Sequence, residues 1–500
     1  MGNNTSGGTW CTAGYFSVAP TTLYAAGQLS TIGGGFQNRA TGLISVVSGG
    51  QANIASNTRS SVGGGIQNTA SGYSSTVSGG QSNTASNNYS TASGGYRVTS
   101  DGYGSTASGG YRNCINGHQA TIGGGIYNWI CCSADRTCTA GATIGGGAGN
   151  NTSGGTFGTA VFSVAPTTFY AAGRFSTIGG GFQNRATGTN STVSGGYKNI
   201  ASASTSIVGG GASNTASGAY STVGGGFVVS ATGGRAFAGG GQSNTASGYA
   251  SVLTGGRAST ASGDYAFIGG GKSNTATVAY ATIAGGLANN VAAACSFIGS
   301  GGNNTASGNA SVVGGGASNT ASGYRGTVTG GASNIASGTY SVNAGGNGNN
   351  SSGAYAVLGG GISNTSNGQA TTVAGGRAHT ASNTYSTIGG GYNIGSTGYA
   401  STVSGGYVNC ATAQEAFVGG GRSNIASGVR ATVGGGLSNS AIGAYATIGG
   451  GCTNVASSGS PSTVAGGRLN TASGGYSFVG GGNANTASGL ISFVGGVYQY

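Results

Sequence analysis

The chain has 500 residues, of which 114 are glycine, 3 are proline and only 4% are charged, and its formal net charge is +12. Soluble globular proteins carry roughly 25% charged residues and about 7% glycine, so this composition argues against a series of ordinary compact domains. It also excludes collagen, because no Gly-X-Y period exists and proline is nearly absent. No apolar run reaches the roughly 18 residues of a membrane-spanning helix, so we expect no membrane insertion.

Most of the chain is an array of short repeats, each of which we call a coil. Residues 1–29 precede this array and hold part of one coil and an insertion. The stretch from Gly2 to Gly27, with the core FSVAPTTLYAAG, returns with few changes at residues 149–173. Its proline and clustered aromatic residues predict a loop or β-arm that protrudes from the array. Such insertions are common recognition sites, with decoration or clamping of a trimer as the alternative. The candidate recognition residues in the two copies are Trp10, Tyr24, Phe169 and Tyr170.

Residues 30–127 form the first regular array, and its period is 15. Coils begin at Ser30, Ser45 and Ser60 and follow the phrase S-T-V-G-G-G-x-S-N-T-A-S-G-x-Y, whose residues we number as positions 1 to 15. Fifteen residues are too few for a helical repeat pair or a propeller blade, but they suit one turn of a β-solenoid. We therefore predict an all-β fold, a parallel β-solenoid or β-roll, with two short strands per coil at positions 1–4 and 9–12.

The phrase also predicts which side chains point inward. Side chains alternate along a strand, so positions 1, 3, 9 and 11, which are mostly Ser, Val, Asn and Ala, would fill a small interior. The glycines at positions 5, 6 and 13 would supply positive φ at the corners. Stacked asparagines at position 9 would satisfy backbone groups of the turns. Stability would come from neighbouring coils about 4.8 Å away.

The array is interrupted at residues 128–141, NWICCSADRTCTAG. Cys131, Cys132 and Cys138 are candidates for a disulfide within this insertion or between chains, which would imply an oxidising exterior. Zinc usually binds paired C-x-x-C motifs, and these are missing. Trp129 is a further candidate recognition residue in this insertion.

Residues 142–175 hold one coil and the repeated insertion, and residues 176–500 form the second array. Position 2 points outward in the predicted coil, yet it is often apolar. An exposed apolar column of this length marks an interaction face, and the simplest partner is another copy of the chain in register, as a parallel homotrimer. The predicted interface residues are Val46, Ile207, Phe237, Val252, Phe267, Phe297, Phe417, Phe478 and Phe493.

Both ends of the sequence fall in mid-coil, and neither shows a polar cap. Uncapped solenoid ends expose unpaired backbone groups and invite stacking. We expect either a piece of a longer array or head-to-tail stacking into a filament.

The phrase G-x-x-N-x-A-S-G-x-x-S-T-V-x-G resembles the head repeat of YadA-type trimeric autotransporter adhesins, and also the repeat arrays of bacterial surface proteins and of viral or phage fibre proteins. The resemblance implies a left-handed, trimeric β-roll that serves as a surface fibre or adhesive head. This coil is one residue longer than that of the family, and no stalk, neck or anchor is visible. The matching residues are Gly65, Asn68, Ala70, Gly72, Ser75 and Val77, and later Gly211, Asn214 and Ala216.

The residues needed for catalysis are scarce. The four carboxylates (Asp101, Asp135, Asp264 and Glu415) are scattered, so paired acid–base chemistry is not expected. The two histidines have neither triad nor metal spacing. The 16 basic residues form no dense run of the kind that nucleic-acid sites show. We expect no enzymatic activity, no cofactor and no nucleic-acid partner.

The sequence thus predicts a structural or adhesive fibre or filament that is extracellular, on a cell surface or on a virion. Its expected partners are copies of itself and a host-cell, matrix or glycan surface. A viral or phage fibre protein is the alternative. An ice-binding solenoid is a third hypothesis, because position 2 carries threonine in several coils, although valine and phenylalanine interrupt this column. These threonines are Thr31, Thr76, Thr91, Thr106 and Thr121.

Overall fold

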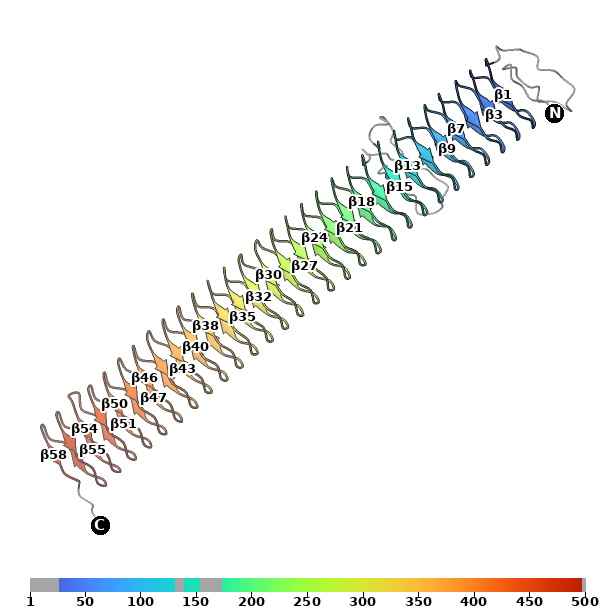
Figure 1. Ribbon diagram of the computed structural model, residues 1–500. Helices are drawn as coiled ribbons and strands as arrows, with labels where there is room; N and C mark the ends of the chain where they lie inside the picture. Colours follow the sequence, from blue (N-terminus) through green and yellow to red (C-terminus); the bar gives the residue numbers. More distant parts are fainter. Residues whose placement is uncertain (1–26, 131–138, 153–172, 497–500) are drawn as a thin grey trace, which may run out of the picture. The chain divides into compact units, whose positions relative to one another are not determined.

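The computed structural model describes residues 27–130, 139–152 and 173–496, and all regular secondary structure in these ranges is β. The chain divides into two compact units, Met1–Ala258 and Ser259–Tyr500. Each unit is a parallel β-solenoid of 15-residue coils, in which successive coils stack like rungs (Figure 1). The predicted all-β solenoid is confirmed.

Each regular coil contributes two strands of two residues, which is shorter than predicted. The first strand occupies positions 2–3, as in β3 (Val46–Val47), and the second occupies positions 10–11, as in β4 (Ile54–Ala55). β3 pairs in parallel with β5 (Ser61–Val62), and β4 pairs in parallel with β6 (Thr69–Ala70), in each case one coil further on. We call the two resulting sheets the position-2 sheet and the position-10 sheet.

The same two-residue pattern continues through both units. The first unit contains β1 (Thr31–Ile32) to β26 (Val252–Leu253), and the second contains β27 (Thr260–Ala261) to β58 (Phe493–Val494). A third line of contacts, which the sequence did not predict, runs through position 7, where Phe36 pairs in parallel with Gln51. The N–H of Gln51 in turn donates to the carbonyl of Gly65 at 2.9 Å. Neighbouring coils are therefore joined at three places.

The corners use positive φ at four positions. Glycine at position 5 has it in many coils, as at Gly64 with 151°. Glycine at position 6 has φ near +90°, as at Gly50 with 90°. Positions 8 and 15 are also left-handed although they hold other residues, such as Ala52 with φ 52° and Tyr220 with φ 60°. Such conformations are uncommon for residues with a Cβ, and here bonds to the preceding coil hold them. The N–H of Ala52, for example, donates to the carbonyl of Phe36 at 2.8 Å.

Glycine at position 13 serves a different purpose from the one predicted. The prediction of positive φ there is wrong, because neither Gly72 nor the other described glycines at position 13 are among the residues with positive φ. A Cβ at Gly72 would instead collide with the backbone carbonyl of Asn87 in the next coil. Close approach between coils, and not backbone freedom, therefore favours glycine at this corner in the coils that have it, while other coils place residues such as Asn57 and Asn87 there.

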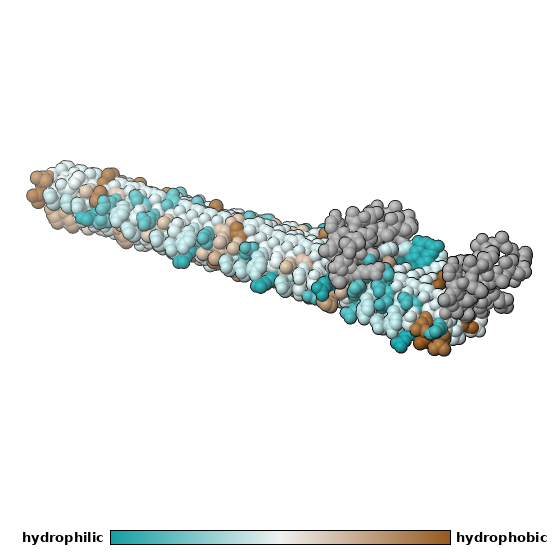
Figure 2. All heavy atoms as spheres, turned by 90° about the horizontal axis from the view of Figure 1, so that it is seen from above, coloured by the Kyte–Doolittle hydropathy of each residue, from teal (hydrophilic) through white to brown (hydrophobic). Residues whose placement is uncertain are grey.

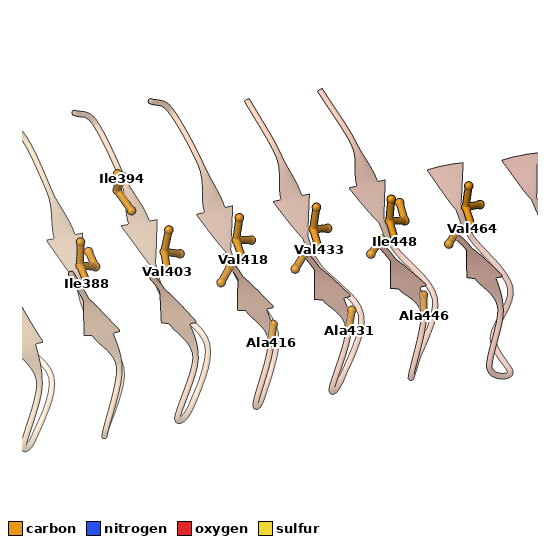
Figure 3. Close-up of a cluster of buried hydrophobic side chains, with 14 of the residues drawn as sticks. Ile388, Ile394, Val403, Ala416, Val418, Ala431, Val433, Ala446, Ile448 and Val464 are labelled. Atoms are coloured by element: carbon orange, nitrogen blue, oxygen red, sulfur yellow. The ribbon is translucent and has the colours of Figure 1, made fainter. Parts of the chain in front are cut away.

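The interior consists of positions 1, 3, 9 and 11, as the alternation predicted. In one coil, Ser45, Val47, Asn53 and Ala55 all have no exposed surface. Because these side chains are small, the two sheets lie close together, and the core is a thin layer of side chains stacked along the solenoid. Figure 3 shows part of this core in the second unit, with Val403, Val418 and Val433 in one row and Ala416 and Ala431 in a row beside it.

Asparagine at position 9 connects each coil to the next. The Nδ2 of Asn319 donates to the carbonyl of Gly315 in its own coil at 2.8 Å and to that of Gly331 in the next coil at 2.9 Å. Its Oδ1 accepts from the N–H of Asn334 at 2.9 Å. The same three bonds recur around Asn53, Asn68 and Asn214. The predicted structural role of this asparagine column is confirmed.

The interruptions of the array leave the stacking of coils intact. Thr121, Thr143 and Thr177 are successive partners in the position-2 sheet, and the asparagine column bridges the same coils across 22 and 34 residues. The described residues stop at Ile130 and Thr152, which are both at position 11, and resume at position 13 of the coil. The described chain is therefore interrupted at the same corner of the coil in both places.

Candidate interaction surfaces

The outward positions define two faces and two edges in each unit. Position 2 lines one face, position 10 lines the other, and the corners at positions 7–8 and 14–15 form what we call the 7/8 edge and the 14/15 edge. On the side seen in Figure 2, much of the surface is close to neutral in hydropathy, and hydrophobic side chains occur as separate patches. The chemical features of the surface are therefore few and can be located by coil position.

The nine predicted interface residues lie at position 2, outside the core. In the second unit, Phe267, Phe297 and Phe417 are 37%, 38% and 37% exposed, while the following residue of each strand is buried. Phe478 stacks on Phe493 with ring centroids 5.1 Å apart. The remaining members lie in the position-2 sheet of the first unit and are partly or largely exposed: Val46, Ile207, Phe237 and Val252.

Threonine at position 2 forms a longer column than the sequence suggested. The extra segments leave the register unchanged, so the threonines on both sides of them become direct neighbours in the first unit. Seven successive coils carry threonine: Thr76, Thr91, Thr106, Thr121, Thr143, Thr177 and Thr192.

Tyrosine side chains stack along the edges. On the 14/15 edge of the second unit, Tyr265 and Tyr280 lie 5.2 Å apart between ring centroids and 4° from parallel. Tyr340 and Tyr355 repeat this arrangement at 5.3 Å and 6°. The repeated phrase ends in tyrosine at position 15, and stacked pairs form where two adjacent coils both carry it.

Basic side chains of the edges rest on tyrosine rings. On the 7/8 edge, the guanidinium group of Arg422 lies 5.2 Å from the ring centroid of Tyr407. On the 14/15 edge, Arg430 pairs with Glu415 through Nε and Oε2 at 2.8 Å, and both side chains are exposed. This hydrogen bond from Arg430 lowers the pKa of the Glu415 carboxyl. Cation–π contacts of exposed groups contribute about 0.5–1 kcal/mol each, so they order the edges without making them rigid.

Two titratable side chains belong to the coils themselves. His379 replaces the asparagine of position 9: its Nδ1 accepts from the N–H of Ile394 at 3.1 Å, and burial lowers its pKa. Burial raises the pKa of the Cys410 thiol in β47 (Cys410–Ala411), which disfavours the reactive thiolate. Cys295, by contrast, is an exposed thiol on the 14/15 edge.

The candidate recognition residues fall mostly outside the described residues. Trp129 is described, and it lies in β14 (Trp129–Ile130) at position 10, paired with Cys114 in the neighbouring coil. Its partly exposed ring therefore belongs to the position-10 sheet, next to the point where the chain departs. The candidates that lie outside the described residues are Trp10, Tyr24, Cys131, Cys132, Cys138, Phe169 and Tyr170.

Within residues 27–130, 139–152 and 173–496, no cluster of three or more His, Cys, Asp or Glu side chains could hold a metal ion. The same ranges include no helix that is long and apolar enough to cross a membrane. No protein-family model matches the chain, and no curated protein matches its sequence. The likeness to YadA-type heads therefore stays a resemblance of the repeated phrase.

Proposed function

We propose that the chain is a subunit of a structural or adhesive fibre, in which identical chains associate in register through their position-2 sheets as a parallel homotrimer. One observation supports this proposal above the others. The backbone of each coil pairs with its neighbours and the small interior is closed, yet the position-2 sheet of the second unit carries partly exposed phenylalanines among threonines and valines.

The arrangement of these rings favours a second copy over an unrelated partner. Phe267, Phe297 and Phe417 occupy the same coil position, and all are a little under two-fifths exposed. In a parallel assembly in register, each ring meets the equivalent ring of the partner at the same height. An apolar seam, interrupted by threonines such as Thr282 and Thr402, then forms without any change in the coils. It removes from water rings that a single chain would leave exposed.

The edges would remain outside such an assembly. Their tyrosine and basic side chains offer contacts to a host-cell, matrix or glycan surface, in keeping with an extracellular, cell-surface or virion-surface location. A fibre of this kind performs no catalysis and needs no cofactor. A viral or phage fibre is the same assembly in another biological setting.

The oligomeric state tests the proposal. Sedimentation of the purified chain should give the mass of a trimer, and electron cryo-microscopy should show three chains per cross-section. The triple variant Phe267→Ser, Phe297→Ser and Phe417→Ser should shift the species toward monomer. A matched variant replaces three apolar residues of position 7 in the same unit, Leu287→Ser, Ile362→Ser and Leu437→Ser, which are similarly exposed, and should leave the trimer intact. A chain that stays monomeric at every concentration overturns the proposal.

Ice binding is a second candidate, and the unbroken threonine column favours it. Seven threonines in register, from Thr76 to Thr192, present hydroxyl and methyl groups at the regular spacing of the coils. A thermal-hysteresis assay tests this function directly. Activity that disappears in a Thr106→Lys and Thr121→Lys variant would support it, and a wild-type chain without activity excludes it.

A further inference from the structure

The stacked tyrosine pairs are held in place by the backbone. Tyr265 and Tyr280 occupy position 15 of adjacent coils in the second unit, and both have left-handed backbone, with φ of 58° and 59°. The N–H of Tyr280 donates to the carbonyl of Asp264 in the preceding coil at 2.9 Å. Rotation of the side chains therefore leaves the two Cα atoms one coil apart, and the rings remain neighbours.

The rings are both close and accessible. Tyr265 is 50% exposed and Tyr280 is 57% exposed, with 5.2 Å between ring centroids and nearly parallel planes. In a parallel stack of this kind, the Cε carbons of the two rings lie on corresponding sides. A modest rotation about the side-chain torsions brings one Cε of each ring together.

The composition directs oxidation toward these rings. The chain has 25 tyrosines but only 1 methionine and 2 tryptophans, so few other side chains compete to lose an electron. Cys295 is a competitor on the same edge, because it holds position 15 in the coil that follows Tyr280 and is exposed. Tyr249, at position 14 of the coil before Tyr265, is another. A tyrosyl radical formed at Tyr265 would meet Tyr280 before it met any other tyrosine fixed in the same column.

We propose that the stacked pairs are sites of oxidative cross-linking to dityrosine, with a hydroperoxide as oxidant and a haem peroxidase as catalyst. Each phenol loses one electron and one proton, and the two radicals join through a new Cε–Cε bond. The Cε hydrogens then move to the oxygens and restore both phenols. In total the protein loses two hydrogen atoms, and hydrogen peroxide becomes two molecules of water.

The cross-link would fasten adjacent coils covalently. A bond between Tyr265 and Tyr280 closes a covalent loop of one coil. The two coils would then stay joined at this edge even when the hydrogen bonds between them open. The Tyr340–Tyr355 pair offers the same closure in the second unit, and Tyr96–Tyr111, stacked at 5.2 Å, offers it on the 7/8 edge of the first. The proposal does not depend on association between chains.

Peptide mapping tests the Tyr265–Tyr280 site. The full chain is treated with hydrogen peroxide and horseradish peroxidase, denatured and digested with trypsin. Cleavage after Arg257, Lys272 and Arg325 separates the two tyrosines, because Tyr265 lies in residues 258–272 and Tyr280 in residues 273–325. The expected product is one species that contains both peptides and is two hydrogen atoms lighter than their sum, together with dityrosine fluorescence.

Matched variants decide whether stacking matters. Tyr280→Phe keeps the ring and should abolish the joined peptide. Tyr220→Phe removes an equally exposed tyrosine whose neighbours at position 15 are Thr205 and Arg235, and it should leave the yield unchanged. The proposal fails if Tyr220 enters cross-links as often as Tyr265. It also fails if the yield per chain rises in proportion to protein concentration, because the bond would then form between chains.

Discussion

An asparagine at position 9 forms hydrogen bonds to the next coil. Its replacement directly tests how much these bonds contribute to the free energy of unfolding. Asn319→Ala leaves the buried carbonyl of Gly315 and the buried N–H of Asn334 without their partner. Unsatisfied buried groups cost about 1–3 kcal/mol each, so we expect the free energy of unfolding to fall by about 3 kcal/mol. Urea unfolding followed by circular dichroism measures this loss.

Asn309→Ala is the matched control for that prediction. Asn309 belongs to the preceding coil and is exposed at position 14, so its loss should change the free energy of unfolding very little. Equal effects of the two substitutions would show that the column of buried side chains contributes nothing specific.

His379 makes the same column sensitive to pH. Burial lowers its pKa in the folded chain, whereas in the unfolded chain the pKa is near its usual 6.5. The unfolded state therefore binds the proton more readily, and stability falls as the pH drops from about 6.5 toward the lowered pKa of the folded state. We expect His379→Asn, which restores the common residue of position 9, to remove this part of the pH dependence in unfolding curves. Identical pH profiles of the two proteins would contradict this expectation.

Among the elements, the coil of residues 341–355 stands apart because its interior is polar. Asn343 and Ser351 are fully buried where other coils place valine and alanine. Asn343 Nδ2 donates to the carbonyl of Asn349 at 2.9 Å, and that carbonyl also accepts from the N–H of Ile335 at 2.8 Å. The hydrophobic cluster shown in part in Figure 3 begins only in the following coil, at Leu358. The interior of this coil therefore contributes less apolar contact than that of its neighbours.

Replacing the two polar core residues of coil 341–355 with apolar ones should stabilise this coil. The double variant Asn343→Val and Ser351→Ala restores the common pattern and leaves the carbonyl of Asn349 satisfied by Ile335. It removes the long 3.3 Å bond that the N–H of Gly345 donates to Asn343 Oδ1. We expect the free energy of unfolding to rise by about 1 kcal/mol. Amide hydrogen exchange in residues 341–355 should slow at the same time, while faster exchange there would show that the buried amide is needed.

The sequence predicted the elements well wherever side-chain chemistry repeats. The period, the inward columns and the outward position of Phe267 all follow from alternation along a strand. The left-handed residues at positions 8 and 15 could not be predicted, because alanine, serine, arginine and tyrosine carry no local preference for that backbone. Bonds between coils impose it, as at Ala52. The stacked pair of Tyr265 and Tyr280 is likewise a property of two coils and not of either one.

For the whole molecule, the continuity of register across residues 131–138 and 153–172 leads to a deletion experiment. Without residues 154–172, the twelve residues 142–153 run directly into the three residues 173–175 and form a coil of the regular length of 15. The threonine and asparagine columns already join the flanking coils. We expect the deletion variant to fold with an unchanged circular dichroism spectrum and an equal or higher unfolding midpoint. A lower midpoint would show that the segment supports the stack.

The three lines of contact between coils also have a mechanical consequence. Their hydrogen bonds point from each coil to the next, so a force applied along the stacking direction within one unit loads all of its coil boundaries in series. Each boundary should open separately and release fifteen residues, or about 50 Å of extended chain. In a single-molecule pulling experiment, each opening would appear as one peak of the force–extension curve. We therefore expect a parallel solenoid of this kind to unfold coil by coil at low force and in steps of equal length. It would absorb mechanical work over a long extension while its covalent backbone stays intact.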